Sequence, residues 1–254
     1  MSRIIAVANQ KGGVGKTTTS INLSSALANS GKKILVIDLD PQANTTSGLG
    51  IDKSGLEFHI YDILLGKKKL YDVLLETRIE NLSLLPSHMV LAGAEIELIG
   101  AEKREYILKK ILLDVKYTYD FIIIDCPPSL NILTVNALTA SDTVLVPIQC
   151  EYFALEGLTQ LIYTIELIKK NLNKRLKIEG LVFTMFDART NLSAQVVDEV
   201  KHHLKHEVYK SVIPRNIRLA EAPSHGLPID LYDPDSKGAI AYKDLAKEVI
   251  LKKF

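Results

Sequence analysis

The sequence predicts an α/β fold: a doubly wound, mostly parallel sheet with helices on both faces. Short apolar runs have the composition of strands buried on both sides, namely Ile4 to Ala8, Ile34 to Ile37, Phe121 to Ile124, Val144 to Ile148 and Leu181 to Phe183. Longer stretches with helical spacing separate them, namely Thr17 to Asn29, Ala92 to Val115, Leu155 to Leu172, Ser193 to Lys205, and Ala239 to the end. This alternation predicts ligand binding at the carboxyl ends of the strands.

The bulk composition indicates an ordinary globular chain. Of its 254 residues, 47% are hydrophobic and 24% are charged, and no Pro/Gly/Ser-rich linker or internal repeat divides it. We therefore expect one domain over residues 1–254. The formal net charge of +1 gives no overall attraction to nucleic acid or membrane, so any basic surface must arise from local clustering.

Cysteine content and the apolar runs bear on the compartment. Cys126 and Cys150 lie beside apolar runs, which favours buried thiols in a reducing compartment over a disulfide scaffold. The apolar stretch after Arg3 is too short for a signal peptide, and no run approaches the roughly 20 apolar residues that span a bilayer. The sequence therefore predicts a cytoplasmic protein with no membrane partner.

The first strand leads directly into a glycine-rich loop that a helix follows. The loop reads Gln10-Lys11-Gly12-Gly13-Val14-Gly15-Lys16-Thr17-Thr18. Glycines let successive backbone N–H groups turn toward phosphate oxygens, and the positive end of the helix dipole adds to that field. Lys16 is expected to reach the β- and γ-phosphates of a nucleotide, and the Thr17 hydroxyl to ligate Mg²⁺. We therefore expect the residues from Lys11 to Thr18 to hold a nucleotide as a P-loop.

Two predicted strands end in carboxylates. The second strand runs into Asp38-Leu39-Asp40, where the period of two points both carboxylates the same way. The third strand delivers Asp125, as a Walker B strand does, and such an aspartate holds Mg²⁺, usually through a water. For Asp40 the alternative is a capped turn, which an Asp-Pro pair commonly makes. Together these carboxylates are expected to complete a Mg·nucleotide site.

The loop departs from the usual P-loop pattern, with Gln10 in place of glycine and a second lysine, Lys11, inside it. In this respect the sequence resembles the deviant Walker A ATPases, whose motif reads K-G-G-x-G-K-T-T. The resemblance implies that Lys11 reaches across a sandwich dimer to phosphates held by the other subunit, so that nucleotide binding and dimerisation are coupled. It also implies that Asp40 positions or activates the attacking water and that Asp38 supports the Mg²⁺ shell.

The same resemblance assigns a nucleobase site and a switch loop. The stretch from Ser211 to Asn216 matches the one with which the family holds adenine, with Pro214 and Asn216 as the contacts. Met185 is a weaker candidate that would pack on the base. The Cys-Pro-Pro loop that begins at Cys126 matches the family's second switch region, so a redox or iron–sulfur role for this cysteine is not expected.

The resemblance covers essentially the whole chain, and two stretches point to the ParA/Soj branch, namely Asn44 to Gly50 and Glu221 to Gly226. This branch implies an ATP hydrolase that uses ATP and Mg²⁺, forms an ATP-dependent homodimer, binds double-stranded DNA without sequence preference and responds to a ParB-type partner. Its cargo would be a chromosome or a plasmid in a bacterial cell. Because the P-loop begins within ten residues of Met1, we expect no N-terminal helix-turn-helix domain and no operator binding.

A local basic excess fits non-specific DNA binding. Between Lys169 and Arg218 there are eleven Lys and Arg against five Asp and Glu. The cations are Lys169, Lys170, Lys174, Arg175, Lys177, Arg189, Lys201, Lys205, Lys210, Arg215 and Arg218. The resemblance implies that Arg189 and Arg218 contact DNA phosphates, while a solvated face stays an open alternative for the lysines. His202 and His206 lie one helical turn apart, but no third ligand is evident beside them, so the three histidines His202, His203 and His206 are expected on a surface helix rather than in a zinc site.

Two other functions share this P-loop. A MinD-like membrane-cycling ATPase would end in an amphipathic membrane helix, whereas Leu245 to Phe254 reads as the last helix of the fold with a short tail. A regulator of replication initiation that binds an initiator protein is compatible with the partitioning function. We therefore expect a partitioning ATPase in the cytoplasm, associated with the nucleoid.

Overall fold

The computed structural model describes residues 2–151, 154–204 and 208–252, without the side chains of 154–156, 192, 194 and 201–204. The strands are β1 Arg3–Val7, β2 Ile34–Asp38, β3 Leu75–Glu76, β4 Leu82–Leu85, β5 Phe121–Asp125, β6 Thr143–Gln149, β7 Lys177–Phe186 and β8 Val208–Pro214. The helices are α1 Lys16–Asn29, α2 Asn44–Gly48, α3 Ile60–Leu64, α4 Leu70–Val73, α5 Ala94–Glu97, α6 Ile107–Ile111, α7 Ile132–Ala140, α8 Ala154–Asn171, α9 Asn191–Leu204, α10 Ile217–Glu221, α11 Ile229–Tyr232 and α12 Lys237–Leu251.

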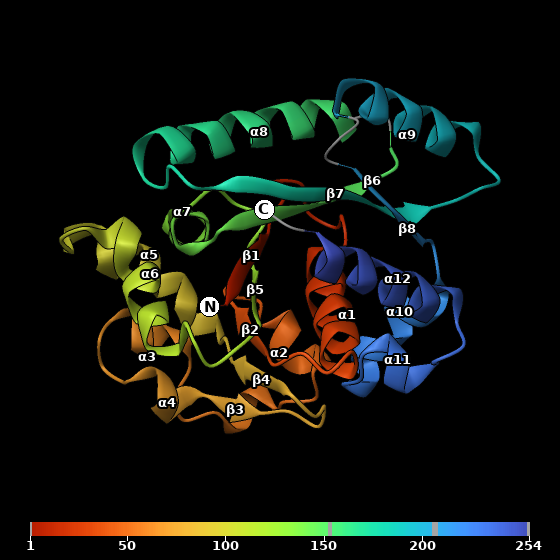
Figure 1. The fold of residues 1–254 in the computed structure, drawn as a ribbon. Helices are drawn as coiled ribbons and strands as arrows, with labels where there is room; N and C mark the ends of the chain where they lie inside the picture. The colour runs from red at the N-terminus through yellow and green to blue at the C-terminus, as the bar shows by residue number, and fades with distance from the viewer. Residues whose placement is uncertain (1, 152–153, 205–207, 253–254) are drawn as a thin grey trace.

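These strands form one sheet in the order β3-β4-β2-β5-β1-β6-β7-β8 (Figure 1). All recorded pairings are parallel except β3 with β4. Asp38 of β2 and Val7 of β1 both lie opposite Asp125 of β5, so three neighbouring strands end at one level. The predicted doubly wound, mostly parallel α/β fold is confirmed, and the P-loop and both strand-end carboxylates meet at this edge.

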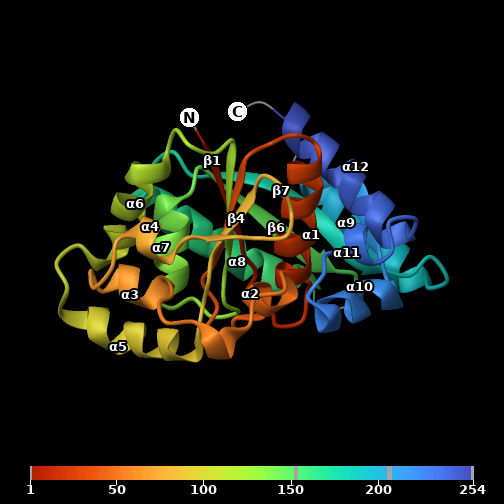
Figure 2. The same cartoon turned by 90° about the horizontal axis from the view of Figure 1, so that it is seen from below.

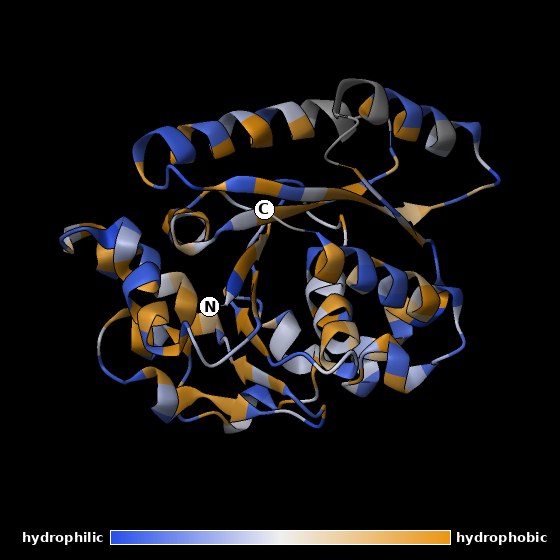
Figure 3. Ribbon diagram, viewed as in Figure 1, coloured by the Kyte–Doolittle hydropathy of each residue, from blue (hydrophilic) through white to orange (hydrophobic). Residues whose placement is uncertain are grey.

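Apolar side chains on each face of the sheet pack under a separate layer of helices. Along β1, Ile5 and Val7 join the core under α1 and α12, whereas Ala6 packs with the core under α7 and α8. Figure 1 shows α8 and α9 on one side of β7, with α1 and α12 on the other. In Figure 3 the strands are largely hydrophobic, while α8 and α12 alternate hydrophobic and hydrophilic residues, as helices with one buried face do. Burial on both faces explains why these strands read as continuous apolar runs.

The helix predicted over Ala92 to Val115 is wrong as one continuous element. The segment contains α5 and α6 and short 3-10 helices at Met89–Gly93, Leu98–Gly100, Arg104–Tyr106 and Leu112–Val115. Gly100 ends one piece, and Lys103 adopts a left-handed φ of 53°, which an α-helix does not tolerate. Its buried leucines therefore reach the core from several short turns rather than from one helix face.

Three observed strands, β3, β4 and β8, are not among those that the sequence predicts. Strand β4 reads Leu-Ser-Leu-Leu, and leucine gives no strand preference over four residues. Strand β8 ends in Pro214, which is tolerated because, among the described strands, β8 lies at the edge of the sheet and pairs only with β7. The other predicted strands and helices lie within a few residues of the observed ones, as α1 at Lys16–Asn29 illustrates.

Candidate functional site

The glycine-rich loop between β1 and α1 is tied to the neighbouring strands. Thr184 Oγ1 donates to the Val14 carbonyl at 2.8 Å, and Asn9 Nδ2 donates to the Pro147 carbonyl at 2.8 Å. Gly15 has a left-handed φ of 85°, so a residue with a Cβ would be strained there. Gly15 caps α1, and no side chain caps this end or places an acid in the first turn. The N-terminal N–H groups of α1 therefore fit an anion such as a phosphate.

The two lysines of the loop differ in setting. Lys16 is 7% exposed, and its Nζ donates to the Lys11 carbonyl at 3.0 Å. Burial lowers the pKa of Lys16, while the nearby Asp125 acts against that shift. The Lys11 ammonium instead lies at the surface, 2.6 Å from the carboxylate of Glu151. Lys16 is thus held inside the loop, and Lys11 faces outward.

Asp125 is the centre of a buried hydroxyl cluster. Its carboxylate accepts hydrogen bonds from Thr17 Oγ1 at 2.8 Å, Thr45 Oγ1 at 2.7 Å and Ser20 Oγ at 3.0 Å. Burial raises the pKa of Asp125, which the three hydroxyls oppose by stabilising the charged form. The structure thus brings Thr17 and Asp125 together as the sequence predicted.

Asp38 ends β2 and Asp40 lies two residues beyond it, and the two carboxylates occupy different environments. Asp38 is fully buried and accepts from the backbone N and Oγ1 of Thr46 at 2.8 and 2.7 Å. Burial, and then the negative charge of Asp125, raise the pKa of Asp38. Asp40 is partly exposed, and its Oδ1 accepts from the Gln42 backbone at 2.9 Å. Asp40 therefore makes the capped turn that was the alternative reading, which leaves its second oxygen for other partners.

The oxygen atoms at this edge fit Mg²⁺. A hydroxyl from Thr17 and a carboxylate from Asp125 lie together, and oxygen is the ligand that Mg²⁺ prefers. Within the described residues no group of three or more His, Cys, Asp or Glu is arranged to hold a metal. In the usual protein Mg²⁺ site, one or two carboxylates act with substrate phosphates and water.

Sequence reasoning missed several side chains that build this edge. Thr45 and Thr46 come from α2, and Ser87 follows β4; the Ser87 backbone donates to Thr46 Oγ1 at 2.9 Å. The Thr45-Thr46 pair lies inside the stretch from Asn44 to Gly50, whose resemblance to a family branch implies no contact with Asp125. Its proximity to Asp125 results from the fold, and no sequence spacing indicates it.

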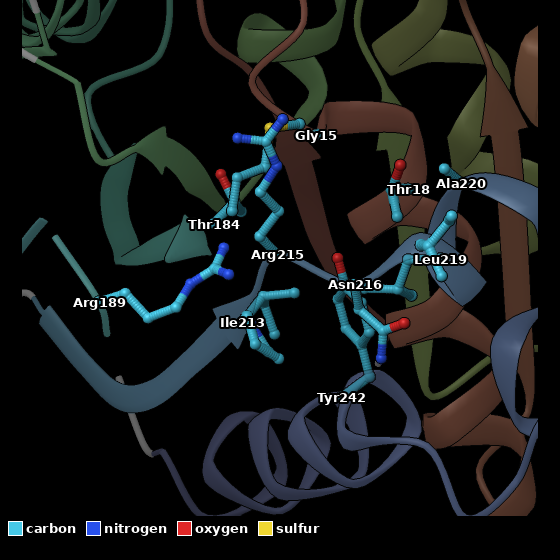
Figure 4. Close-up of a pocket in the computed structure, with 13 residues that line it drawn as sticks. Gly15, Thr18, Thr184, Arg189, Ile213, Arg215, Asn216, Leu219, Ala220 and Tyr242 are labelled. Carbon is cyan, nitrogen blue, oxygen red and sulfur yellow. The ribbon is translucent and has the colours of Figure 1, made fainter. Parts of the chain in front are cut away.

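A cavity of about 550 Å³ adjoins the P-loop. Its described lining includes Gly15, Thr18, Thr184, Met185, Arg189, Ile213, Pro214, Arg215, Asn216, Leu219 and Tyr242 (Figure 4). The two predicted adenine contacts, Pro214 and Asn216, thus line one cavity with the weaker candidate Met185. Asn216 also caps α10, since its Oδ1 accepts from the Arg218 backbone at 2.8 Å. The cavity has the size of a small-molecule site, about 300 to 1,000 Å³.

Several of the described basic residues line two different hollows of the molecule. Arg189 extends toward this cavity in Figure 4 and forms a bidentate pair with Asp187, at 2.9 and 2.7 Å. Arg218 lies on α10 and pairs with Glu221 at 3.0 Å. The cations near residue 175 line a different cleft at another edge of the sheet. Lys205 and His206 lie outside the described residues, and the side chains of residues 201–203 are not described.

The cysteines and the long helices add two further observations. Cys126 and Cys150 are both buried and unpaired with each other, as predicted. Burial raises the pKa of the Cys126 thiol, which disfavours the reactive thiolate. No helix in the described part of the chain has the length and apolar content that crossing a membrane requires.

The chain is similar to several known proteins. A family described as "AAA domain" matches residues 2–178. The sporulation initiation inhibitor protein Soj of Bacillus subtilis is 59% identical over 249 residues, which cover 98% of each chain. The chromosome partitioning protein ParA of Myxococcus xanthus is 49% identical, over 98% of this chain and 88% of its own. The crystal structure of cobyrinic acid a,c-diamide synthase from Mycobacterium smegmatis, with bound ADP and magnesium, has a TM-score of 0.87 and 39% identity, over 98% and 94% of the two chains.

Proposed function

The chain belongs to the ParA/Soj family of chromosome-partitioning ATPases, and we propose that it moves DNA through an ATP-driven dimer cycle. The family makes the chain an ATPase. In the proposed cycle, Mg·ATP drives a sandwich dimer that binds double-stranded DNA without sequence preference. A ParB-type partner stimulates hydrolysis, and the dimer then releases the DNA. The chain acts as one domain in the cytoplasm of a bacterium, with a chromosome or plasmid as cargo.

The observation that carries the proposal is the junction of the P-loop with the adjoining cavity. Gly15 and Thr18 line the cavity that also contains Pro214 and Asn216. A nucleotide placed there has its base against Pro214 and Asn216 and its phosphates at the start of α1. The related Mycobacterium smegmatis protein was solved with ADP and magnesium, which supports nucleotide and Mg²⁺ binding here.

The residues at the phosphate end would divide the work of hydrolysis. Lys16 and the backbone N–H groups of the loop neutralise and orient the phosphates. Thr17 and Asp125 would hold Mg²⁺, with Asp38 behind them, and the bound metal supplies positive charge to the phosphate oxygens. Asp40, the partly exposed carboxylate of the set, accepts a hydrogen bond from the attacking water and orients it.

Dimerisation would complete the site through Lys11. This lysine is partly exposed, and its ammonium pairs with the partly exposed Glu151 rather than with a group inside the loop. A cation that arrives from a second subunit can stabilise charge on the transferred phosphoryl group, as arginine fingers do. Arg189 and Arg218 would contact DNA phosphates on the assembled dimer.

Gel filtration of the Asp40→Ala variant tests nucleotide binding, dimerisation and the role of Asp40 together. With Mg·ATP we expect this variant to accumulate as a dimer, because binding persists while hydrolysis is slow. With Mg·ADP, or with an added Lys16→Ala change, it should elute as a monomer. A monomeric Asp40→Ala protein in Mg·ATP would contradict the dimer cycle, and rapid turnover by it would contradict the role of Asp40.

A further inference from the structure

A second cleft, of about 660 Å³, lies at the amino ends of the parallel strands, whereas the P-loop lies at their carboxyl ends. Its walls come from the amino ends of β1, β6 and β7 and from the end of α12, through Arg3, Thr143, Lys177 and Lys252. The P-loop follows the carboxyl end of β1, so the length of that strand separates the two places. Figure 2 shows the end of α12 on this side of the molecule, away from α2 and α10. The cleft is therefore distinct from the nucleotide site.

Positive charge dominates this cleft. Six of its lining residues are cationic: Arg3, Lys169, Lys174, Arg175, Lys177 and Lys252. Asp142 is the one carboxylate among its described lining residues. Two neighbouring carboxylates offset part of this positive charge. Glu179 accepts a hydrogen bond from Arg3, and Glu166 pairs with Lys169 at 3.4 Å. Three described carboxylates, Asp142, Glu166 and Glu179, thus lie in or beside a cleft that six cations line.

Some of these cations have structural partners that fix the floor of the cleft. Arg3 Nε donates to Glu179 at 3.1 Å, and its Nη1 donates to the carbonyls of Val249 and Lys252 at 2.8 and 3.0 Å. The side chain of Lys252 lies over the Tyr209 ring, 5.2 Å from its centre. These contacts join the start of β1 to the end of α12, so the floor is rigid.

Lys174 and Arg175 stand on a fixed turn at the rim. Asn173, beside them, is 7% exposed, and its Nδ2 donates to the carbonyls of Leu138 and Ser141 at 3.0 and 2.7 Å. In the part of the chain that the structure describes, neither Lys174 nor Arg175 has an acidic partner. Two cations held in place beside other cations repel one another until an anion binds between them.

We propose that this cleft binds a small soluble compound that carries two or more phosphate groups. The planar guanidinium of Arg175 matches a phosphate bidentately, and Lys174 adds a point charge. The cleft volume is typical of small-molecule sites, about 300 to 1,000 Å³. Because the cleft is concave and at the far edge from the P-loop, a compact anion suits it better than the backbone of a DNA duplex. The proposal does not depend on the partitioning cycle.

Calorimetry with inorganic tripolyphosphate tests this site. The protein is first saturated with Mg·ADP in excess magnesium, so that the P-loop is filled, and a fluorescent ADP analogue reports that nucleotide is not displaced. We expect binding that weakens as salt rises from about 50 to 200 mM, since charge drives it. The Lys174→Gln/Arg175→Gln variant should bind at least about tenfold more weakly, a loss of roughly 1.4 kcal/mol.

The matched control changes an equal charge elsewhere. Lys109 and Lys110 are adjacent exposed cations on α6 that do not line the cleft. Lys109→Gln/Lys110→Gln should bind as the parent does, and Arg175→Lys alone should keep part of the affinity. Thermal unfolding confirms that each variant is folded.

Two outcomes would overturn the proposal. One is the same Kd for tripolyphosphate in both double variants. The other is absence of tripolyphosphate binding by the parent protein, and a loss of DNA binding in Lys174→Gln/Arg175→Gln would then make the cleft a nucleic-acid surface.

Discussion

The Lys11 ammonium forms an ion pair with Glu151 of its own chain, with 2.6 Å between Nζ and Oε2. A lysine that acts across a dimer must leave this partner first, so the pair opposes the proposed assembly. Both side chains are more than a third exposed, and such pairs are worth about 0.2 to 1 kcal/mol. We expect Glu151→Gln to tighten Mg·ATP-dependent dimerisation by up to about fivefold in analytical ultracentrifugation. An unchanged or weaker dimer would show that Glu151 does not restrain Lys11.

Alanine substitutions of the two loop lysines should have different effects on ATP affinity. Lys16→Ala removes a buried cation at the phosphate end, and we expect calorimetry to show loss of ATP affinity. Lys11→Ala leaves the loop interior intact, because Lys16 bonds to the backbone carbonyl of residue 11 rather than to its side chain. Its monomer should bind ATP as the parent does and fail to dimerise. Equal loss of ATP affinity in both variants would count against action across the dimer.

The buried carboxylates predict how stability depends on pH in magnesium-free protein. Burial raises the pKa of Asp38 to about 7 and that of Asp125 to about 6, above the usual 3.9 or so. The folded state then binds more protons than the unfolded state between about pH 4 and 7, so stability falls as pH rises through that window. Urea unfolding in the presence of EDTA measures this stability at each pH. The stability of the Asp38→Asn variant should fall less steeply as pH rises. A parent that gains stability over this range, with the same slope in the variant, would contradict the assignment.

Mg²⁺ affinity should also depend on pH, because the same buried carboxylates must lose their protons before they bind the metal. Because the metal requires ionised carboxylates, its binding releases protons, and affinity should rise as pH rises from about 6 to 8. Calorimetry in buffers of different ionisation enthalpy counts the released protons. Asp38→Asn should release fewer, and an equal release would show that Asp38 is already ionised before the metal binds.

Charge reversal tests the DNA surface. Arg189→Glu and Arg218→Glu should each abolish retention of DNA in a gel shift with Mg·ATP on the Asp40→Ala background. Parent binding should weaken with salt, with a log–log slope of about −0.9 per phosphate neutralised. Because Arg189 lines the nucleotide cavity, ATP binding and dimerisation are measured on the same samples. If both variants bind DNA as the parent does, the DNA-binding surface does not include Arg189 and Arg218.

Much of the phosphate end was predictable because its chemistry is contiguous in the sequence. Lys16 and Thr17 follow the loop glycines directly, and Asp125 ends an apolar run. The roles of Thr45 and Glu151 were not predictable, because Thr45 lies 80 positions from Asp125 and Glu151 lies 140 positions from Lys11, and only the fold brings these partners together. The interrupted segment from Ala92 to Val115 failed for a related reason: its apolar spacing suits a helix, but the local backbone at Lys103 does not.

The order of the strands places the phosphate end of the nucleotide site on inner strands of the sheet and the nucleobase end on an edge strand. The P-loop, Asp38 and Asp125 are carried by β1, β2 and β5, which have paired neighbours on both sides, whereas Pro214 ends β8, which has a neighbour on one side only. Backbone amides of central strands exchange with solvent mainly through global unfolding, and those of edge strands through smaller openings. The wall beside Pro214 and Asn216 can therefore fray and re-form while the Asp125 centre stays folded. A nucleotide that contacts both ends would oppose the local opening of β8, so the amides of β8 would exchange with solvent more slowly when nucleotide is bound.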